Sequence, residues 1–146
     1  MPLAAALEVP LLAKDTVKES LFDSLGTGDR AWSRRLGAAS MEVVFALAAE
    51  APRAVLESFW RRPHALERLR ALGRPLVEVH CACPAEVATA RYRERVRHPG
   101  HGGVGDDEIA GWVSDAGPLA LGPVLEVDTT APVDVDAVTR WVRERW

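Results

Sequence analysis

The chain has 146 residues and a mass of 15.9 kDa, and 48% of its residues are hydrophobic and 27% charged. This is the composition of one ordinary globular domain that is long enough to bury a core. A net charge of −3 and a pI near 5.8 argue against broad binding to nucleic acid or to an anionic membrane, because both need a basic surface. Any anion that the chain recognises is therefore expected to be small.

Two features of the sequence favour a cytoplasmic protein. Cys81 and Cys83 are separated by one residue, which is a poor arrangement for a structural disulfide and suits a reducing compartment. The apolar start MPLAAALEVP has no basic segment before it and is interrupted by Glu8, so it predicts neither a signal peptide nor a membrane span. A possible metal cluster has spacings that match none of the usual zinc patterns. It consists of His80, Cys81, Cys83, His98 and His101.

The first half of the chain alternates short apolar runs with amphipathic helical patterns. Thr16 can cap a helix that Gly26 ends, and Pro63 opens a later helix that Gly73 ends. Glu57 stands near the carboxyl end of an apolar run. The expected helices are 2–7, 16–25, 32–50 and 63–72, and the expected strands are 9–12 and 54–59.

The stretch from Pro75 to His101 changes its periodicity and then becomes rich in arginine. A β-branched run predicts a buried strand at 76–80, and Pro84 fits the first turn of a helix from Ala85 to Arg97. The sequence HPGHGGVGDD is too rich in glycine to continue that helix, so a flexible segment is expected there. A positively charged helix that runs into such a segment is typical of a lid that grips phosphate.

The arginines of this helix also have a plainer interpretation. Arg91 and Arg95 share one face, since residues four apart are neighbours on a helix. Arginines on an exposed helix are usually solvated, and Glu86 and Glu94 could pair with them at little energetic consequence. Solvated surface charges and a phosphate lid both remain open for this stretch.

The rest of the chain continues the alternation, with helices expected at 106–116 and 133–145 and a strand at 123–127. Strands that alternate with helices predict a parallel sheet with helices on both faces, in three layers. We find no repeat, low-complexity tract or linker in the sequence, so residues 1–146 are expected to form a single α/β domain.

Polar side chains follow the predicted strands at their carboxyl ends, where ligands bind in open parallel sheets. These positions are Asp15, Glu57, the turn from His80 to Cys83, and the loop from Asp128 to Thr130. Carboxylates and arginines at one edge suit phosphoryl transfer. That reaction needs a group that orients the acceptor hydroxyl, a ligand for magnesium, and cations that neutralise the transferred group.

Four segments in order resemble successive pieces of a P-loop kinase for small molecules. They are LLAKDTVKESLFDSLG, AVLESFW, VEVHCACPAEVATARYRERVRHPGH and VLEVDTT, and they span nearly the whole chain. The chain looks similar to the AAA-family ATP-binding proteins that are grouped with zeta toxins and chloramphenicol phosphotransferases. The resemblance implies a transferase that uses ATP and Mg²⁺ to phosphorylate a small-molecule hydroxyl.

The resemblance also implies a role for each candidate residue. Asp15 would orient or deprotonate the acceptor hydroxyl, although it could instead be a charge that stabilises a helix N-terminus. Glu57 would contact substrate or magnesium. Lys14 and Lys18 would lie near the substrate entrance. The lid arginines on the triphosphate would be Arg91, Arg95 and Arg97, and the loop from Asp128 through Thr129 and Thr130 to Pro132 would approach the adenine.

One departure from the family pattern is large, because the glycine-rich loop GxxxxGK[ST] is absent from the 146 residues. MPLAAALEVPLL resembles the end of the helix that should follow this loop. The expected domain is therefore a truncated one that lacks its central first strand, in the order 2-3-1-4-5, and binds ATP weakly or not at all. A rearranged sheet, a longer reading frame, a dimer or another strand-donating partner would each fill the gap. The alternative function is a non-catalytic α/β remnant that binds an anion or a protein partner.

Overall fold

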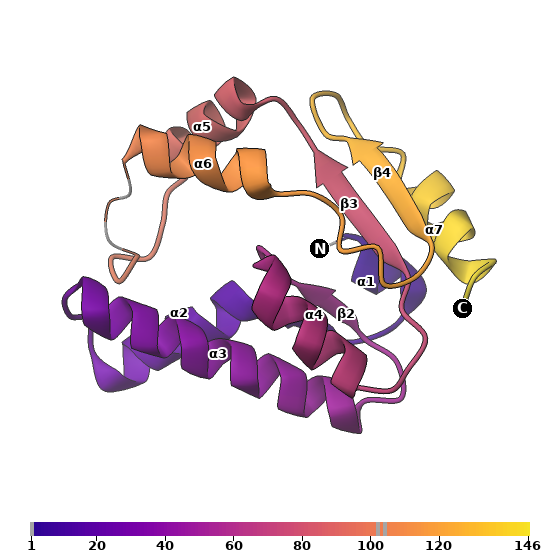
Figure 1. Ribbon diagram of the computed structural model, residues 1–146, viewed down its shortest axis with the longest axis horizontal. Helices are drawn as coiled ribbons and strands as arrows, with labels where there is room; N and C mark the ends of the chain where they lie inside the picture. The colour runs from indigo at the N-terminus through magenta and orange to yellow at the C-terminus, as the bar shows by residue number, and fades with distance from the viewer. Residues whose placement is uncertain (1, 102, 104) are drawn as a thin grey trace. The chain divides into compact units, whose positions relative to one another are not determined.

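The computed structural model describes residues 2–101, 103 and 105–146 and contains helices and short parallel strands (Figure 1). The helices are α1 (Pro2–Leu7), α2 (Lys14–Leu25), α3 (Arg30–Glu50), α4 (Arg62–Ala71), α5 (Ala85–Glu94), α6 (Asp106–Asp115) and α7 (Val135–Arg143). The strands are β1 (Leu11–Ala13), β2 (Val55–Glu57), β3 (Glu78–Ala82) and β4 (Val124–Asp128). No helix in the described part of the chain is both long enough and apolar enough to cross a membrane.

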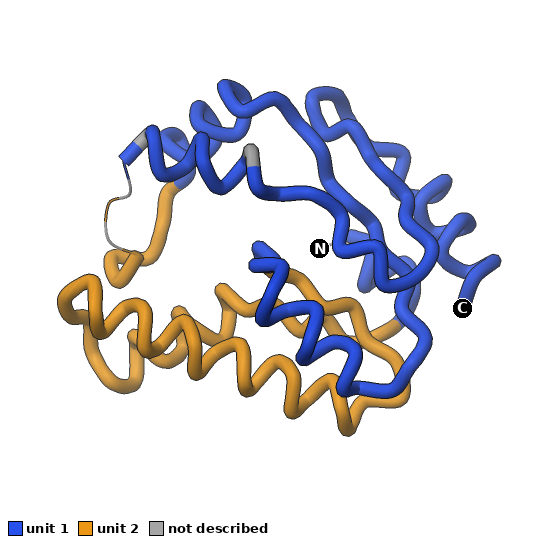
Figure 2. The backbone as a smooth tube through the Cα atoms, viewed as in Figure 1, with its two compact units in different colours: residues 1–8, 59–95, 104–146 blue, residues 9–58, 96–103 orange. Residues whose placement is uncertain are grey.

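The chain forms two compact units, each built from segments that are separate in sequence (Figure 2). Unit 1 contains residues 1–8, 59–95 and 104–146, and unit 2 contains residues 9–58 and 96–103. Each unit holds one two-stranded parallel sheet, β3 with β4 in unit 1 and β1 with β2 in unit 2.

Unit 2 places two helices beside its short sheet. β1 pairs with β2 in a register that sets Ala13 opposite Glu57. Helix α2 begins directly after β1 and ends at Gly26, whose positive φ of 84° is easily adopted by glycine. Helix α3 begins where Asp29 accepts a hydrogen bond from the backbone N–H of Trp32 at 2.7 Å. The two helices pack on each other, and the side chains buried in this unit include Phe22, Leu36, Val44 and Phe45.

A carboxylate at the start of the sheet in unit 1 anchors a turn that precedes β4. β3 pairs with β4 from Glu78 opposite Val124 to Ala82 opposite Asp128. The carboxylate of Glu78 accepts hydrogen bonds from the backbone N–H groups of Leu119 and Ala120, at 2.7 and 2.9 Å. This fixes the turn before β4. Helix α5 packs on α6, and α1 packs on α7.

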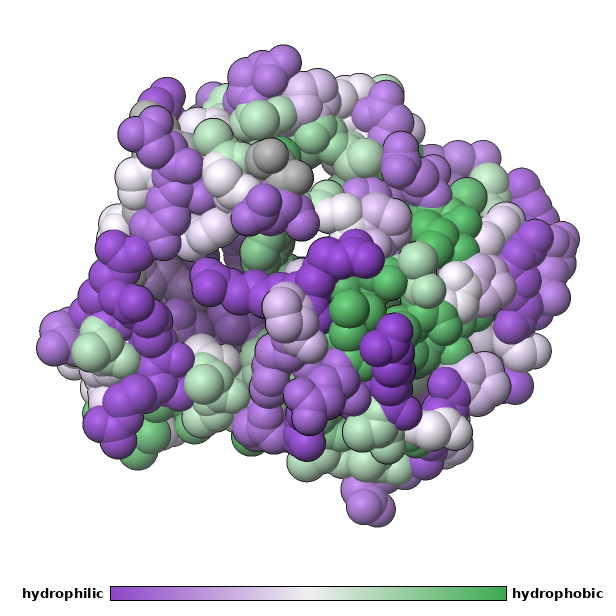
Figure 3. All heavy atoms as spheres, in the orientation of Figure 1, coloured by the Kyte–Doolittle hydropathy of each residue, from purple (hydrophilic) through white to green (hydrophobic). Residues whose placement is uncertain are grey.

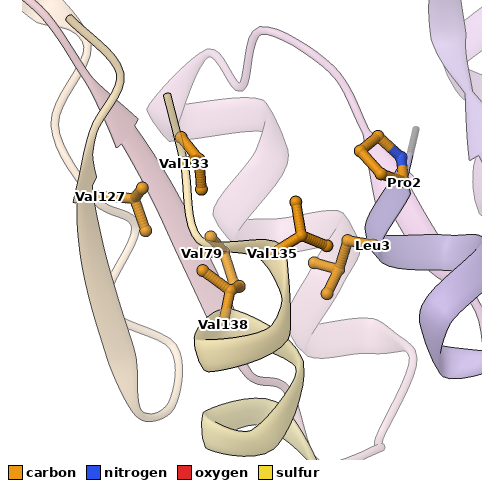
Figure 4. A pocket seen from close by; sticks show the side chains of 7 residues that line it. All are labelled: Pro2, Leu3, Val79, Val127, Val133, Val135 and Val138. Carbon is orange, nitrogen blue, oxygen red and sulfur yellow. The ribbon is translucent and has the colours of Figure 1, made fainter. Parts of the chain in front are cut away.

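A small apolar cavity of about 170 Å³ lies inside unit 1 (Figure 4). Its lining residues come from α1, β3, β4, α7 and the segment before α7, and they are Pro2, Leu3, Val79, Val127, Val133, Val135 and Val138. Ligand sites are usually 300 Å³ or larger and have a few polar groups that orient the ligand. This cavity has no such group in its lining, so it does not serve as the starting point for a functional site.

Hydrophilic side chains cover most of the face shown in Figure 3, and apolar side chains gather over the β3–β4 part of unit 1. Among the large apolar side chains that remain exposed, Val43 and Leu47 both belong to α3, at 40% and 47% exposure. Isolated exposed apolar residues are normal on soluble domains.

The structure differs from three expectations: that the strands form one sheet, that a helix reaches Arg97, and that Thr16 caps a helix. The strands at 54–59 and 76–80 do not share a sheet, because β2 pairs only with β1 and β3 only with β4 among the described residues. The two strands therefore have no common sheet edge at which one ligand could contact the residues that follow both of them. The helix expected to continue to Arg97 ends at Glu94, with extended backbone at Arg95, so Arg95 does not share a helix face with Arg91 and Arg97 lies outside the helix. Thr16 lies within α2 instead of capping it.

Candidate functional site

The carboxyl ends of β1 and β2 lie side by side in unit 2 because the two strands are parallel. Glu57 is the last residue of β2, opposite Ala13, and Lys14 and Asp15 follow at once in the first turn of α2. Lys14 Nζ donates a hydrogen bond of 2.8 Å to Asp15 Oδ1. A carboxylate in the first helical turn is also favoured by the helix dipole.

Asp15 is held in its charged form by the cations around it. Burial alone would raise its pKa, but the hydrogen bond and charge of Lys14, with the charge of Arg97, outweigh burial and lower the pKa below its usual value. A carboxylate that stays ionised in a partly buried position can orient a hydroxyl group by accepting its hydrogen bond.

Lys18 lies one turn further along α2 and is buried, with only 8% of its surface exposed. Its Nζ donates a hydrogen bond of 2.9 Å to Ser33 Oγ on α3 and lies 5.2 Å from the centre of the Phe22 ring. Burial lowers the pKa of Lys18, and the positive charges of Lys14 and Arg97 lower it further, against the opposing effect of Asp15. Three cations therefore lie around the carboxylate of Asp15.

The segment that begins at Val96 returns to α2 and adds the third cation. An Nη2 atom of Arg97 lies 3.2 Å from His101 Nδ1, and His101 Nε2 lies 3.0 Å from Glu19 Oε1. His98 Nε2 lies 3.0 Å from Asp23 Oδ1, and Gly100 is buried. Residues 98–101, the start of the glycine-rich stretch that was expected to be flexible, pack against α2.

A second group of predicted residues lies in unit 1. Arg91 donates hydrogen bonds to the backbone oxygen of Thr129 at 2.6 Å and to its Oγ1 at 3.3 Å. The Asp128 carboxylate accepts a hydrogen bond of 2.8 Å from the backbone N–H of Thr130. Hydrogen bonds from the backbone and side chain of Thr130, together with the charge of Arg91, lower the pKa of Asp128. Arg91 thus joins the end of α5 to the loop after β4. Arg95 is exposed and follows the last residue of α5.

The predicted residues are therefore divided between the two units. Unit 2 contains Lys14, Asp15, Lys18, Glu57 and Arg97, and unit 1 contains Arg91, Arg95, Asp128, Thr129 and Thr130. Within unit 2 the structure joins Asp15, Lys14, Lys18 and Arg97 to residues that the sequence did not single out for this site, which are Glu19, Asp23 and Ser33.

A sequence signal for these additional residues does exist. Asp15 and Glu19 are four apart, as are Lys14 and Lys18, so α2 carries a mixed row of acids and bases. His98 and His101, considered as metal ligands, contact carboxylates instead. Within the described residues no group of three or more His, Cys, Asp or Glu side chains is arranged to hold a metal ion.

Comparison with known proteins identifies a close structural relative. No family model matches the chain, and no curated protein does. A crystal structure of a protein from Chloroflexus aurantiacus J-10-fl, described as a putative kinase, matches with a TM-score of 0.87 and 34% sequence identity. The match covers 99% of this chain and 88% of that one. The chain therefore has a kinase-like α/β fold and belongs to the same family as this Chloroflexus protein.

Proposed function

We propose that the chain is part of an ATP-dependent phosphotransferase that acts on a hydroxyl group of a small molecule. The observation that carries this proposal is the charged carboxylate of Asp15, which follows a parallel strand and is surrounded by Lys14, Lys18 and Arg97. Phosphoryl transfer depends mainly on positioning and on neutralising the charge of the transferred group. Membership of a family that includes a kinase-like protein supports the same class of reaction.

In this proposal Asp15 accepts a hydrogen bond from the acceptor hydroxyl and orients its oxygen for attack. Lys14, Lys18 and Arg97 stabilise the negative charge of the transferred phosphoryl group. Glu57, at the end of the neighbouring strand, is the second carboxylate and a ligand for Mg²⁺, which needs only one or two carboxylates when phosphates and waters complete its shell. Arg91 and Arg95 contact the triphosphate of the nucleotide, and the loop from Asp128 to Thr130 approaches its adenine.

The residues of this chain fit only part of an ATP site. Phosphates of a P-loop kinase rest on the backbone N–H groups and the lysine of GxxxxGK[ST], and no such sequence occurs in the 146 residues. The two strand pairs support a missing central strand, since β1–β2 and β3–β4 are the pairs that the order 2-3-1-4-5 leaves when its first strand is removed. We propose that an upstream segment or a partner chain supplies this strand and the loop.

About an eighth of the Chloroflexus chain has no counterpart in this one, because 88% of that chain is matched. A parallel central strand would also satisfy backbone groups at the open edges of two short sheets, and unpaired backbone groups are costly when buried.

Titration calorimetry with ATP and magnesium tests the proposal. The 146-residue chain should bind weakly or not at all, and a form extended upstream in the same reading frame should bind if that extension encodes GxxxxGK[ST]. A matched control replaces the lysine of that motif by alanine in the extended form. Micromolar binding by the 146-residue chain would show that the nucleotide site is elsewhere.

A second candidate function is binding without catalysis. The absence of GxxxxGK[ST] from the chain favours it, because the cations of unit 2 could hold an anion without any nucleotide. Binding of inorganic phosphate together with failure of every extended form to hydrolyse or transfer phosphate from ATP would favour this second function.

A further inference from the structure

The hydrogen-bond partners of His101 assign its protonation state. Its Nδ1 atom faces Nη2 of Arg97 at 3.2 Å, and a guanidinium can only donate hydrogen bonds, so Nδ1 must accept and carry no proton. Its Nε2 atom faces Glu19 Oε1 at 3.0 Å, so Nε2 carries the proton and donates it. His101 is therefore a neutral imidazole of the Nε2–H form, and only 5% of its side chain is exposed.

His98 has the same arrangement three residues earlier. The backbone N–H of Gly100 donates to His98 Nδ1 at 3.0 Å, which leaves Nε2 to donate to Asp23 Oδ1 at 3.0 Å. Each imidazole thus joins a donor on its own segment to a carboxylate on α2. A second proton on either ring would occupy Nδ1 and remove the bond to that donor.

Phe22 forms the apolar centre of this contact. Its ring is stacked on His98, with centroids 5.4 Å apart and planes 6° apart, and His101 meets it edge-on at 5.8 Å. Ser33 adds a polar contact from α3. Its Oγ donates to the backbone oxygen of Gly100 at 3.3 Å and accepts a hydrogen bond from Lys18. The segment is thereby tied to both α2 and α3.

We propose that His101 is a positioning residue for the phosphotransferase site, which in its neutral Nε2–H form fixes the guanidinium of Arg97 beside Asp15. His98 anchors the same segment through its contact with Asp23, and protonation of His101 withdraws Arg97 from the carboxylate. The effect on turnover rests on the proposed function. The effect on the position of Arg97 does not, and it can be measured without a nucleotide.

The charged groups that face His101 favour the neutral ring on balance. Burial lowers the pKa of His101, as do the positive charges of Arg97 and Lys18, against the opposing effects of Asp15 and Glu19. Asp15 is itself paired with Lys14, whose Nζ donates to Asp15 Oδ1 at 2.8 Å. The neutral form therefore persists to a lower pH than in an exposed histidine.

Two substitutions separate positioning from simple packing. In His101→Gln the amide retains one acceptor for Arg97 and one donor for Glu19 but does not titrate. In His101→Ala both bonds are lost. His98→Gln is the comparison variant on the same segment, because its partner Asp23 is largely exposed, with 73% of the side chain accessible, and because it leaves the bonds of His101 to Arg97 and Glu19 in place.

Nitrogen-15 NMR of the 146-residue chain, labelled in histidine and arginine, is the direct test. At pH 7.5 the His101 ring should show an unprotonated Nδ1 and a protonated Nε2. The Arg97 side-chain resonances should shift as the pH falls from 7.5 to 5. They should not shift over this range in His101→Gln, and in His101→Ala they should be those of the released form at every pH. A protonated Nδ1 in His101, or Arg97 resonances in His101→Ala identical to those of the parent chain, would overturn the proposal.

Turnover provides a second readout in an extended form that binds ATP. The kcat of His101→Ala should fall about 100-fold, the scale expected when a catalytic group is misplaced by roughly 1 Å, while KM for ATP changes little. His101→Gln should recover most of the rate and abolish its loss on acidification. If no form transfers phosphate but the NMR results hold, the proposed function fails and the positioning of Arg97 stands.

Discussion

The Cα of Gly100 lies against the ring of Phe22 so closely that a methyl group at this position would overlap the ring atoms. Phe22 is itself almost completely buried, with 2% of its surface exposed, and it cannot move without disturbing the interior of unit 2. Gly100→Ala should therefore expel the segment that carries Arg97 or lower the free energy of unfolding by about 1–3 kcal/mol, as overpacking does. Thermal and denaturant unfolding measure the loss of stability.

Gly103→Ala is the matched control for this change, because among the described residues no atom lies within 4 Å of the position that a Cβ would take at Gly103. Its effect on stability should be within about 0.5 kcal/mol, as for ordinary surface substitutions. Equal effects of the two alanines would mean that the contact between Gly100 and Phe22 does not hold the segment in place.

The burial of the charged Lys18 side chain should lower the free energy of unfolding. Its ammonium is buried, and its hydrogen-bond partner is the neutral Ser33. Lys18→Met keeps an unbranched side chain of similar length and removes the burial of charge, so the free energy of unfolding should stay the same or rise by up to about 2 kcal/mol. Chemical denaturation measures it. A loss above about 2 kcal/mol would show that the hydrogen bond and the contact with Phe22 outweigh desolvation.

The sequence predicted the elements of this fold better than their partners. Apolar runs and helix breakers predicted α1, Pro2–Leu7, without error, and they also predicted the regions of all four strands. They could not show that β2 and β3 belong to different sheets, because strand pairing depends on residues distant in sequence. Glycine content favoured a flexible segment from His98 onward, whereas His98 and His101 pack against α2. Gly100 permits close packing against Phe22 there, which local sequence does not reveal.

The candidate site was predictable only in its strand-end residues. Asp15 and Glu57 follow from the rule that ligands bind beyond the carboxyl ends of parallel strands. The partners of Arg97 did not follow from any rule of spacing, because the helix expected to carry Arg97 ends at Glu94 and the chain turns back toward α2. Because the chain turns back, Glu19 contacts His101 and Ser33 contacts the backbone oxygen of Gly100.

The stability of the chain should fall with acidification in a way that depends on His101. The pKa of His101 is lowered in the folded state, so below about 6.5 the unfolded chain binds a proton that the folded chain binds only at lower pH. The associated stability is present above the unfolded pKa and is lost as the pH falls through this window. Unfolding free energies of the parent chain and of His101→Gln, measured from pH 7.5 to 5, should diverge, with the parent losing more. Parallel curves would contradict the assignment.

Arg91 should stabilise the loop after β4 through geometry as well as charge. Its guanidinium reaches both the backbone oxygen and the Oγ1 of Thr129, which a single ammonium cannot reproduce. Arg91→Lys should lower the free energy of unfolding by about 0.5–1.5 kcal/mol, the usual net value of a hydrogen bond. Arg34→Lys, at an exposed position of α3, is the control and should have almost no effect. Equal unfolding curves for the two variants would exclude the loop contact as a stabilising one.

Asp15→Asn tests the central claim most directly, because it keeps the size of the side chain and removes the negative charge. In a form of the chain that binds ATP, turnover should fall by roughly two to four orders of magnitude, the range for loss of a general base or orienting carboxylate, with little change in ATP affinity. Phosphotransfer rates and ATP titrations of the parent and the variant are the measurement. Unchanged turnover would contradict the account and leave Asp15 as a charge that stabilises the first turn of α2.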